Sequence, residues 1–202
     1  DLSYMYEVKF ELKRAVDASF NRITVDGDQS TNDTVLALAN GAAGGKPLGE
    51  ASPGWAAFTR ALEQVCFDLA MMIVHDGEGA DKFVTINVRG AETDEAADLA
   101  ARAVANSMLN KTAWAGEYPN WGRVMDALGY SRAKVVESAV EIAYDKVPAV
   151  VGGLRSQAPH EDLVRVVSQS GFSIHIDLHL GDGAATVYTC NCTEEYVRIN
   201  VV

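Results

Sequence analysis

The most constraining feature of the sequence is a stretch in which apolar and polar residues alternate strictly. The apolar positions of this stretch are Phe172, Ile174, Ile176, Leu178 and Leu180. Because successive side chains of a β-strand point to opposite faces, a period of two predicts a strand with one buried face. A shorter alternation at residues 84–88 predicts a second strand of the same kind. The chain is therefore expected to build a sheet that is covered on at least one side.

Long amphipathic helices are predicted between these strands. Apolar residues follow each other at steps of three and four at Trp55, Phe58, Leu62, Val65, Leu69 and Met72. This spacing places them on one face of a helix that ends near residue 75, and we expect that face to lie in the core. Related patterns predict helices over residues 4–19, 94–104, 121–128 and 160–168, the second of them capped by Thr93.

The remaining apolar runs predict further strands. They lie at residues 23–25, 136–151, 185–190 and 196–202, and a strand or buried helix is expected at 34–39. Gly181-Asp182-Gly183 predicts a hairpin turn. The mixture favours an α+β class, a layered α/β arrangement of mixed, largely antiparallel sheets packed against helices. Residues 1–202 are interpreted as one chain-long unit, with a subdivision near 1–130 and 131–202 as the alternative.

Composition excludes several classes of protein. The chain carries 17 Lys and Arg against 28 Asp and Glu, a formal net charge of −11. Nucleic-acid binding is disfavoured, because phosphate contacts need clustered cations. No apolar run approaches the ~20 residues that span a bilayer, so membrane insertion is not expected. Three cysteines form no disulfide framework and favour a reducing compartment, so we expect a cytoplasmic protein, or an organelle-matrix one in a eukaryote.

No metal site is predicted, although three potential ligands follow one strand face. His175, Asp177 and His179 are spaced two residues apart. Such residues lie roughly 6–7 Å from one another along a strand, too far for all three to converge at bond lengths near ~2 Å. Cys190 and Cys192 match neither a redox motif nor a zinc knuckle, and packing is the preferred interpretation for both.

Three polar segments keep a functional and a structural interpretation open. The loop from Asp26 to Asp33 is either a hydrogen-bonded turn or the wall of a site or subunit contact. Glu78, between Gly77 and Gly79, either follows a helix cap or receives a ligand ammonium. Arg123, after a predicted cap at Asn120, either grips a carboxylate or makes a structural contact.

These segments resemble those of the ornithine acetyltransferase (glutamate N-acetyltransferase) family, specifically its β chain. The segments that carry the resemblance lie in the same order along the chain, at residues 19–21, 23–28, 30–34, 38–41, 77–80 with Lys82, 119–123, 144–145 with 147–148, and 196–200. Each is modest alone, and together they cover nearly the whole chain. The resemblance implies the N-terminal-nucleophile-like acetyltransferase fold of that family.

The resemblance also implies an activity in arginine biosynthesis. Family members cut themselves before a threonine, giving an α and a β chain. The new N-terminal threonine then carries the acetyl group from N2-acetylornithine to glutamate through an acetyl-threonine intermediate. The implied partners are the α chain, in an α2β2 heterotetramer, and the small amino-acid substrates. No cofactor is implied, although acetyl-CoA is an alternative acetyl donor in some members.

Two residues carry over as substrate-binding residues. Glu78 matches the family's glutamate in the Gly-Glu-Gly segment, and a carboxylate suits an ammonium group. Asn200 matches the asparagine near the family's C-terminus, whose amide both donates and accepts hydrogen bonds. No catalytic residue carries over, because the family's nucleophilic threonine is expected upstream of Asp1, by about one strand's length or roughly ten residues.

Two other hypotheses remain open from the sequence. A related self-cleaved aminopeptidase with an N-terminal nucleophile is the enzymatic alternative. A binding or structural module without a nucleophile is the non-catalytic alternative. Hydrolysis of peptides without acetyl transfer favours the first, and a genuine start at Asp1 favours the second.

Overall fold

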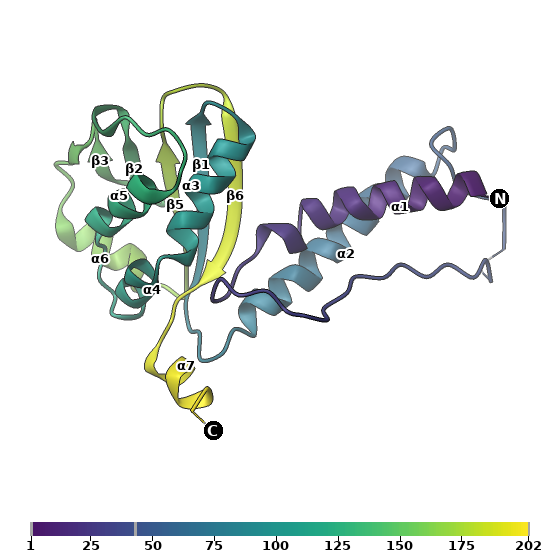
Figure 1. The fold of residues 1–202 in the computed structure, drawn as a ribbon, viewed down its shortest axis with the longest axis horizontal. Coiled ribbons are helices and arrows are strands. Elements are labelled where there is room, and N and C mark those ends of the chain that lie inside the picture. The colour runs from purple at the N-terminus through teal and green to yellow at the C-terminus, as the bar shows by residue number, and fades with distance from the viewer. Residues whose placement is uncertain (1, 43, 202) are drawn as a thin grey trace. The chain divides into compact units, whose positions relative to one another are not determined.

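The computed structural model describes residues 2–42 and 44–201, and it confirms a mixed α+β fold (Figure 1). The helices are α1 Leu2–Asp17, α2 Trp55–His75, α3 Asp94–Asn106, α4 Met108–Ala115, α5 Trp121–Tyr130, α6 His160–Val167 and α7 Glu194–Ile199, with 3-10 turns at Phe20–Arg22 and Glu137–Ala139. The strands are β1 Phe83–Ala91, β2 Glu141–Tyr144, β3 Val147–Val151, β4 Leu154–Arg155, β5 Gly171–Asp177 and β6 Gly183–Cys190. No described helix is long and apolar enough to cross a membrane.

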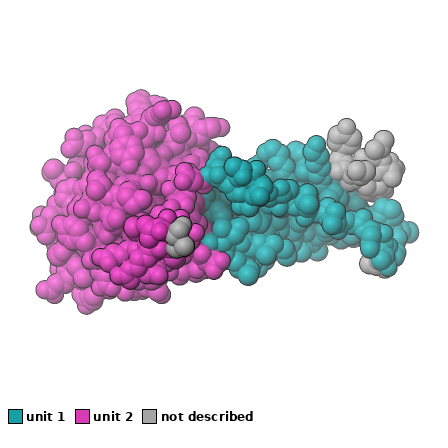
Figure 2. Space-filling model, turned by 60° about the horizontal axis from the view of Figure 1, so that its bottom comes forward, with its two compact units in different colours: residues 1–23, 29–73 teal, residues 24–28, 74–202 magenta. Residues whose placement is uncertain are grey.

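The chain divides into two compact units (Figure 2). Unit 1 consists of the described residues within 1–23 and 29–73, and unit 2 of residues 24–28 and those from 74 onward. The sheet lies in unit 2. Because β1 and β5 are paired within that sheet, residues on both sides of position 130 form one body. The bounds of the units therefore differ from the subdivision near 1–130 and 131–202 considered from the sequence.

The six strands of unit 2 form one sheet in the order β4-β3-β2-β5-β1-β6. Only β1 and β5 are parallel, and every other neighbouring pair is antiparallel. This agrees with the expected mixed, largely antiparallel sheet. The position of β1 between β5 and β6 has one further consequence. The turn at Gly181-Asp182-Gly183 does not join paired strands, so the predicted hairpin is wrong at this point.

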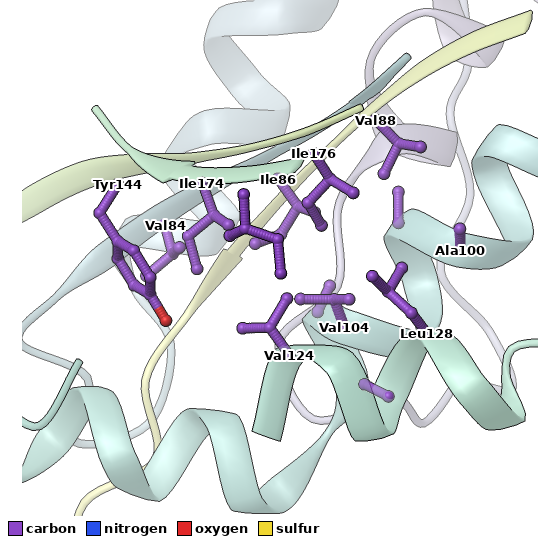
Figure 3. Close-up of a cluster of buried hydrophobic side chains, with 14 of the residues drawn as sticks. Val84, Ile86, Val88, Ala100, Val104, Val124, Leu128, Tyr144, Ile174 and Ile176 are labelled. Atoms are coloured by element: carbon purple, nitrogen blue, oxygen red, sulfur yellow. The ribbon is translucent and has the colours of Figure 1, made fainter. Parts of the chain in front are cut away.

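One face of the sheet is covered by helices and forms the core of unit 2 (Figure 3). The alternating stretch that begins at Phe172 places Ile174 and Ile176 on that face. Beside them lie three residues of β1, and all five side chains are at most 2% exposed: Ile174, Ile176, Val84, Ile86 and Val88. They face apolar side chains of α3 and α5, among them Ala100, Val104, Val124 and Leu128. Both predicted alternating strands are thus confirmed as half-buried strands.

The predicted helix starts are also confirmed where a cap residue marks them. Thr93 accepts a hydrogen bond from the backbone N–H of Ala96, and Asn120 accepts one from Arg123. Helix α4 has no counterpart among the predicted elements. Its Ser107 caps it in the same way, by accepting a hydrogen bond from the N–H of Asn110.

The apolar runs form neither the strand predicted at residues 23–25 nor the strand or buried helix predicted at 34–39. Ile23 makes only an isolated bridge, and residues 34–39 have no regular secondary structure. Leu36 and Leu38 are 74% and 93% exposed. The first run makes a single backbone contact with a strand, the hydrogen bond from the N–H of Thr24 to the carbonyl oxygen of Tyr188 in β6.

The segment at residues 196–202 was expected to be a strand, and the structure places helix α7 there instead. Thr193 caps this helix by accepting a hydrogen bond from the N–H of Glu195. Glu194 and Glu195 occupy its first turn and Arg198 its last, and both acidic side chains form ion pairs with Arg198. These helix-terminal signals outweigh the β-branched residues of the segment.

The apolar stripe predicted as the core face of α2 is half-buried at Trp55, Phe58 and Leu62, and it is exposed in the second half of the helix. Val65, Leu69 and Met72 are 54%, 48% and 64% exposed. The buried positions of the helix lie on another face, at Thr59, Cys66, Ala70 and Val74. Periodicity shows which residues share a face, and the burial of that face depends on what packs against it.

Candidate functional site

Glu78 lies in a tight turn that follows helix α2. Gly79 has a positive φ of +67°, which disfavours any residue with a Cβ atom. A Cβ at this position would also lie 2.7 Å from the Cβ of Glu195 and 2.9 Å from the backbone nitrogen of Tyr196. Glycine therefore allows the start of α7 to approach the turn that carries Glu78.

The segment after β6 is hydrogen-bonded to this turn. The side-chain oxygen of Asn191 accepts from the backbone N–H groups of Asp81 and Lys82, both at 3.1 Å, and its amide nitrogen donates to the carboxylate of Asp81 at 2.6 Å. The Thr193 hydroxyl donates to the carbonyl oxygen of Gly79 at 2.7 Å. Asn191 is 3% exposed, so these bonds also satisfy the polar atoms of a buried amide.

The far side of the turn is held by Lys82. This side chain is 7% exposed, and its Nζ lies 3.2 Å from the carboxylate of Glu117. Glu117 also accepts a hydrogen bond from the hydroxyl of Ser168 at 2.8 Å. That bond, with the bond and charge of Lys82, lowers the pKa of Glu117. The turn with Glu78 is thus attached to α6 as well as to α7.

The two residues predicted to bind substrate are in direct contact. The side-chain nitrogen of Asn200, at the C-terminal end of α7, donates to Glu78 Oε2 at 2.5 Å and to the carbonyl oxygen of Tyr196 at 2.9 Å. Glu78 and Asn200 are both exposed. They form a carboxylate–amide pair on the surface of unit 2, which can accept hydrogen bonds from an ammonium group and can also donate one through the amide.

A second carboxylate lies at this surface. The phenol of Tyr196 donates to Asp26 Oδ2 at 3.1 Å, and Asp26 Oδ1 accepts from the N–H of Asp28 at 2.9 Å. The hydrogen bond to Asp26 raises the pKa of Tyr196, and the negative charges of Asp26 and Glu78 act in the same direction. Tyr196 therefore keeps its proton at neutral pH and stays a donor.

A buried lysine lies behind the end of β6. Lys111 is 1% exposed, and its Nζ donates to the hydroxyl of Thr189 at 2.8 Å and to the carbonyl oxygen of Cys190 at 2.6 Å. Burial lowers the pKa of Lys111, while the neighbouring Cys190, Cys192 and Asp26 act against that shift. The ammonium group fixes the strand end from which Asn191 and α7 continue.

Each of the two interpretations of the polar loop at residues 26–33, part of a site or a hydrogen-bonded turn, applies to one end of the loop. Asp26 and Asp28 belong to unit 2, where Asp26 meets Tyr196. In unit 1, the Ser30 hydroxyl donates to the Asn32 side chain and accepts from the backbone N–H groups of Asn32 and Asp33. One end of the loop thus lies at the candidate site, and the other end forms a local turn.

The contacts of Arg123 and of Asp177 are with residues other than Glu78 and Asn200. Arg123 donates to the carbonyl oxygen of Leu109 at 2.6 Å and joins α5 to α4, the structural alternative. Asp177 accepts from Arg89 at 2.6 Å. Within the described residues, no group of three or more His, Cys, Asp or Glu side chains is placed to hold a metal ion.

Three residues of the site neighbourhood had no assigned role at the level of sequence: Asn191, Lys111 and Tyr196. Asn191 and Lys111 are polar residues that border apolar segments, a pattern that does not separate buried from exposed positions. Tyr196 belongs to a segment that was expected to be a strand. A helix assignment would have placed it one turn before Asn200, on the same face.

Fold and site together define a mixed α+β protein whose surface carries an exposed carboxylate–amide pair, built from segments 122 residues apart. Comparison with known proteins identifies the family within this class of α+β proteins. A profile of the ArgJ family matches residues 6–202. This chain belongs to the ArgJ family.

Individual relatives agree with that assignment. The chain is 51% identical to the arginine biosynthesis bifunctional protein ArgJ of Geobacter sulfurreducens over 189 residues, which cover 93% of the chain and 48% of that protein. It is 40% identical to the mitochondrial ArgJ of Schizosaccharomyces pombe, covering 96% of the chain and 45% of the relative. The chain thus spans about half the length of these relatives.

A solved structure shares the fold. The crystal structure of the arginine biosynthesis bifunctional protein ArgJ from Bacillus halodurans superimposes with a TM-score of 0.90 at 37% identity. The match covers 96% of this chain and 92% of that one.

Proposed function

We propose that this chain supplies the amino-acid-binding residues of an enzyme that transfers an acetyl group from N2-acetylornithine to glutamate in arginine biosynthesis. Glu78 binds the ammonium group of the substrate, and Asn200 binds a neighbouring polar group. The proposal assigns binding to these residues and does not assign the nucleophile to any of them. Membership of the ArgJ family supports the reaction.

The observation that carries the site assignment is the contact between Glu78 and Asn200. The two residues come from segments far apart in the sequence, and their side chains are hydrogen-bonded at 2.5 Å. N2-acetylornithine has one ammonium group, on its side chain, and glutamate has its α-ammonium group. The side-chain ammonium of N2-acetylornithine is therefore the cationic donor for this carboxylate, whereas the α-nitrogen of glutamate receives the acetyl group and has to lie at the acetylated nucleophile.

Ligand binding can replace the hydrogen bond between Glu78 and Asn200 by hydrogen bonds to the ligand. In the structure Glu78 Oε2 accepts from the amide of Asn200. An ammonium group that donates to the same carboxylate leaves the amide free to turn toward another ligand atom, because an amide offers both donors and an acceptor. Binding thus replaces a contact between two protein groups by contacts with the substrate.

The partners and setting follow from the family. We infer that the chain works with an α chain derived from the same precursor, in an α2β2 heterotetramer, without a resident cofactor. The setting is the cytoplasm or an organelle matrix, and the relative from Schizosaccharomyces pombe is named as mitochondrial.

The test is acetyl transfer from N-acetylornithine to glutamate by the complete protein that contains this chain. Glu78→Gln keeps the shape of the side chain and removes its charge, so the KM for N-acetylornithine is expected to rise about 10- to 100-fold. Glu161→Gln, which changes an exposed carboxylate in the first turn of α6, is the matched control and keeps wild-type kinetics. A wild-type protein that transfers no acetyl group would refute the proposed reaction.

A further inference from the structure

Helix α7 carries Asn200 but is not held by a buried apolar face. None of its residues is buried, and Val197 and Ile199 are 59% and 43% exposed. Burial of apolar surface is the main force that positions most helices. Among the described residues, α7 buries no apolar side chain, so its position depends on its hydrogen bonds.

Helix α7 is hydrogen-bonded to the rest of unit 2 at its start and again nearer its C-terminal end. Thr193 joins the beginning of the helix to Gly79. Tyr196 lies four residues before Asn200, so both side chains share one helix face. On that face, the phenol of Tyr196 donates to Asp26 at 3.1 Å, and the amide of Asn200 donates to the carbonyl oxygen of Tyr196 at 2.9 Å.

The acceptor of that contact is itself attached to the body of unit 2. The backbone N–H of Thr24 donates to the carbonyl oxygen of Tyr188 in β6 at 3.0 Å, and the Thr24 hydroxyl donates to Asn106 at 2.7 Å. Asp26 follows two residues later and accepts from the N–H of Asp28. Its carboxylate therefore offers a fixed point, although the side chain is exposed.

We propose that Asp26 and Tyr196 are positioning residues, an anchor that holds α7 so that Asn200 meets Glu78. The assignment rests on the proposed function, because it acts through the two proposed substrate-binding residues. Tyr196 and Asp26 affect binding by fixing the orientation of the amide of Asn200. Loss of the anchor weakens binding of N-acetylornithine and leaves the chemical step unchanged.

The first test uses steady-state kinetics of the complete protein with Tyr196→Phe, which removes one hydroxyl oxygen. The KM for N-acetylornithine is expected to rise about 3- to 10-fold, the range of one ordinary hydrogen bond, while kcat stays within about twofold. Asp26→Ala is expected to give the same change, and the double variant no more than either single change. Tyr130→Phe, at an exposed tyrosine at the end of α5, is the matched control and keeps wild-type kinetics.

The second test asks whether the anchor acts through Asn200. In an Asn200→Ala background, Tyr196→Phe is expected to have no further effect on KM, because the group that it orients is already absent. A merely structural role of Tyr196 would lower kcat and thermal stability and would add to the effect of Asn200→Ala.

A third measurement does not depend on turnover. The backbone N–H of Asn200 is hydrogen-bonded to the carbonyl oxygens of Tyr196 and Val197. Its hydrogen exchange is expected to speed up in Tyr196→Phe, while amides of β1 keep their rates.

The outcomes separate the anchor from the proposed function. If wild-type protein transfers acetyl groups and Asn200→Ala raises KM, but Tyr196→Phe leaves both KM and exchange unchanged, the anchor is refuted alone. Additive effects in the Asn200→Ala background would refute it too. If the wild-type protein transfers no acetyl group, the proposed function fails and the anchor, as a device for substrate binding, fails with it.

Discussion

At the scale of single residues, the structure shows how polar groups are placed inside an apolar core. Asn191 and Lys111 are both buried, and both hold the backbone near the candidate site through hydrogen bonds. Tyr144 differs. It is fully buried, and its hydroxyl has no hydrogen-bond partner in the part of the chain that the structure describes. Burial also raises the pKa of Tyr144.

The hydroxyl of Tyr144 is predicted to cost stability. A buried polar group without a partner carries a desolvation penalty of about 1–3 kcal/mol. Tyr144→Phe is therefore expected to raise the free energy of unfolding by about 1 kcal/mol, as measured by urea denaturation. Tyr130→Phe, at an exposed position, should leave it unchanged. A loss of stability in Tyr144→Phe would show that the hydroxyl has a stabilising contact.

The buried ammonium of Lys111 predicts a pH dependence of stability. Burial lowers the pKa of Lys111 from the ordinary value of 10.5, so the folded state releases this proton at a lower pH than the unfolded state. The contribution to stability is therefore largest above pH 10.5 and is lost as the pH falls through the lowered pKa. The free energy of unfolding of wild type minus that of Lys111→Met should therefore increase as the pH rises toward 10.5.

The control for that titration is Lys146→Met, which removes an exposed lysine of unit 2. Because the other titrating groups are common to both proteins, they cancel in the difference. A difference that stays flat or shrinks with rising pH would contradict the sign derived from the burial of Lys111.

At the scale of elements, local signals were reliable where neighbours in the sequence decide the structure. The strand at Phe172 to Ile176 and the capped starts of α3 and α5 were predictable, because alternation and cap residues are local properties. Helix α7 was not predicted, because the β-branched residues around Tyr196 favour a strand, although the cap at Thr193 and the charges at both ends of the segment are local helix signals. The predicted pair of Glu78 and Asn200 required the family resemblance, since their spacing carries no periodic signal.

The fit between Gly79 and α7 gives a prediction at this scale. Alanine at position 79 would have a positive φ, and its Cβ would lie 2.7 Å from that of Glu195. Gly79→Ala is expected to lower the free energy of unfolding by about 1–2 kcal/mol and to weaken substrate binding.

The matched glycine for comparison is Gly129, which lies in α5 with open space around its Cβ position. Gly129→Ala should stabilise the protein by roughly 0.5–1 kcal/mol, because alanine is favoured in a helix. Equal effects of the two substitutions in urea denaturation would mean that the contact between the turn and α7 does not restrict position 79.

At the scale of the whole molecule, the two units differ in how well their apolar pattern matches their burial. In unit 2 the alternating strands are buried on one face, as the sequence predicts. In unit 1 the second half of the apolar stripe of α2 remains exposed, and so do Leu36 and Leu38. A sequence pattern reports that a face is apolar, and it does not report which body of protein covers it. The helices predicted in unit 1 do form, and it is the burial expected for their apolar positions that the structure does not show.

The central claim is that the carboxylate–amide pair of unit 2 binds the amino-acid substrate. The most direct measurement is a crystal structure of the complete protein with N-acetylornithine bound. We expect the ligand's ammonium nitrogen within hydrogen-bond distance, about 2.7–3.2 Å, of the Glu78 carboxylate, with Asn200 contacting the same molecule. A ligand bound with neither residue in contact would contradict the claim.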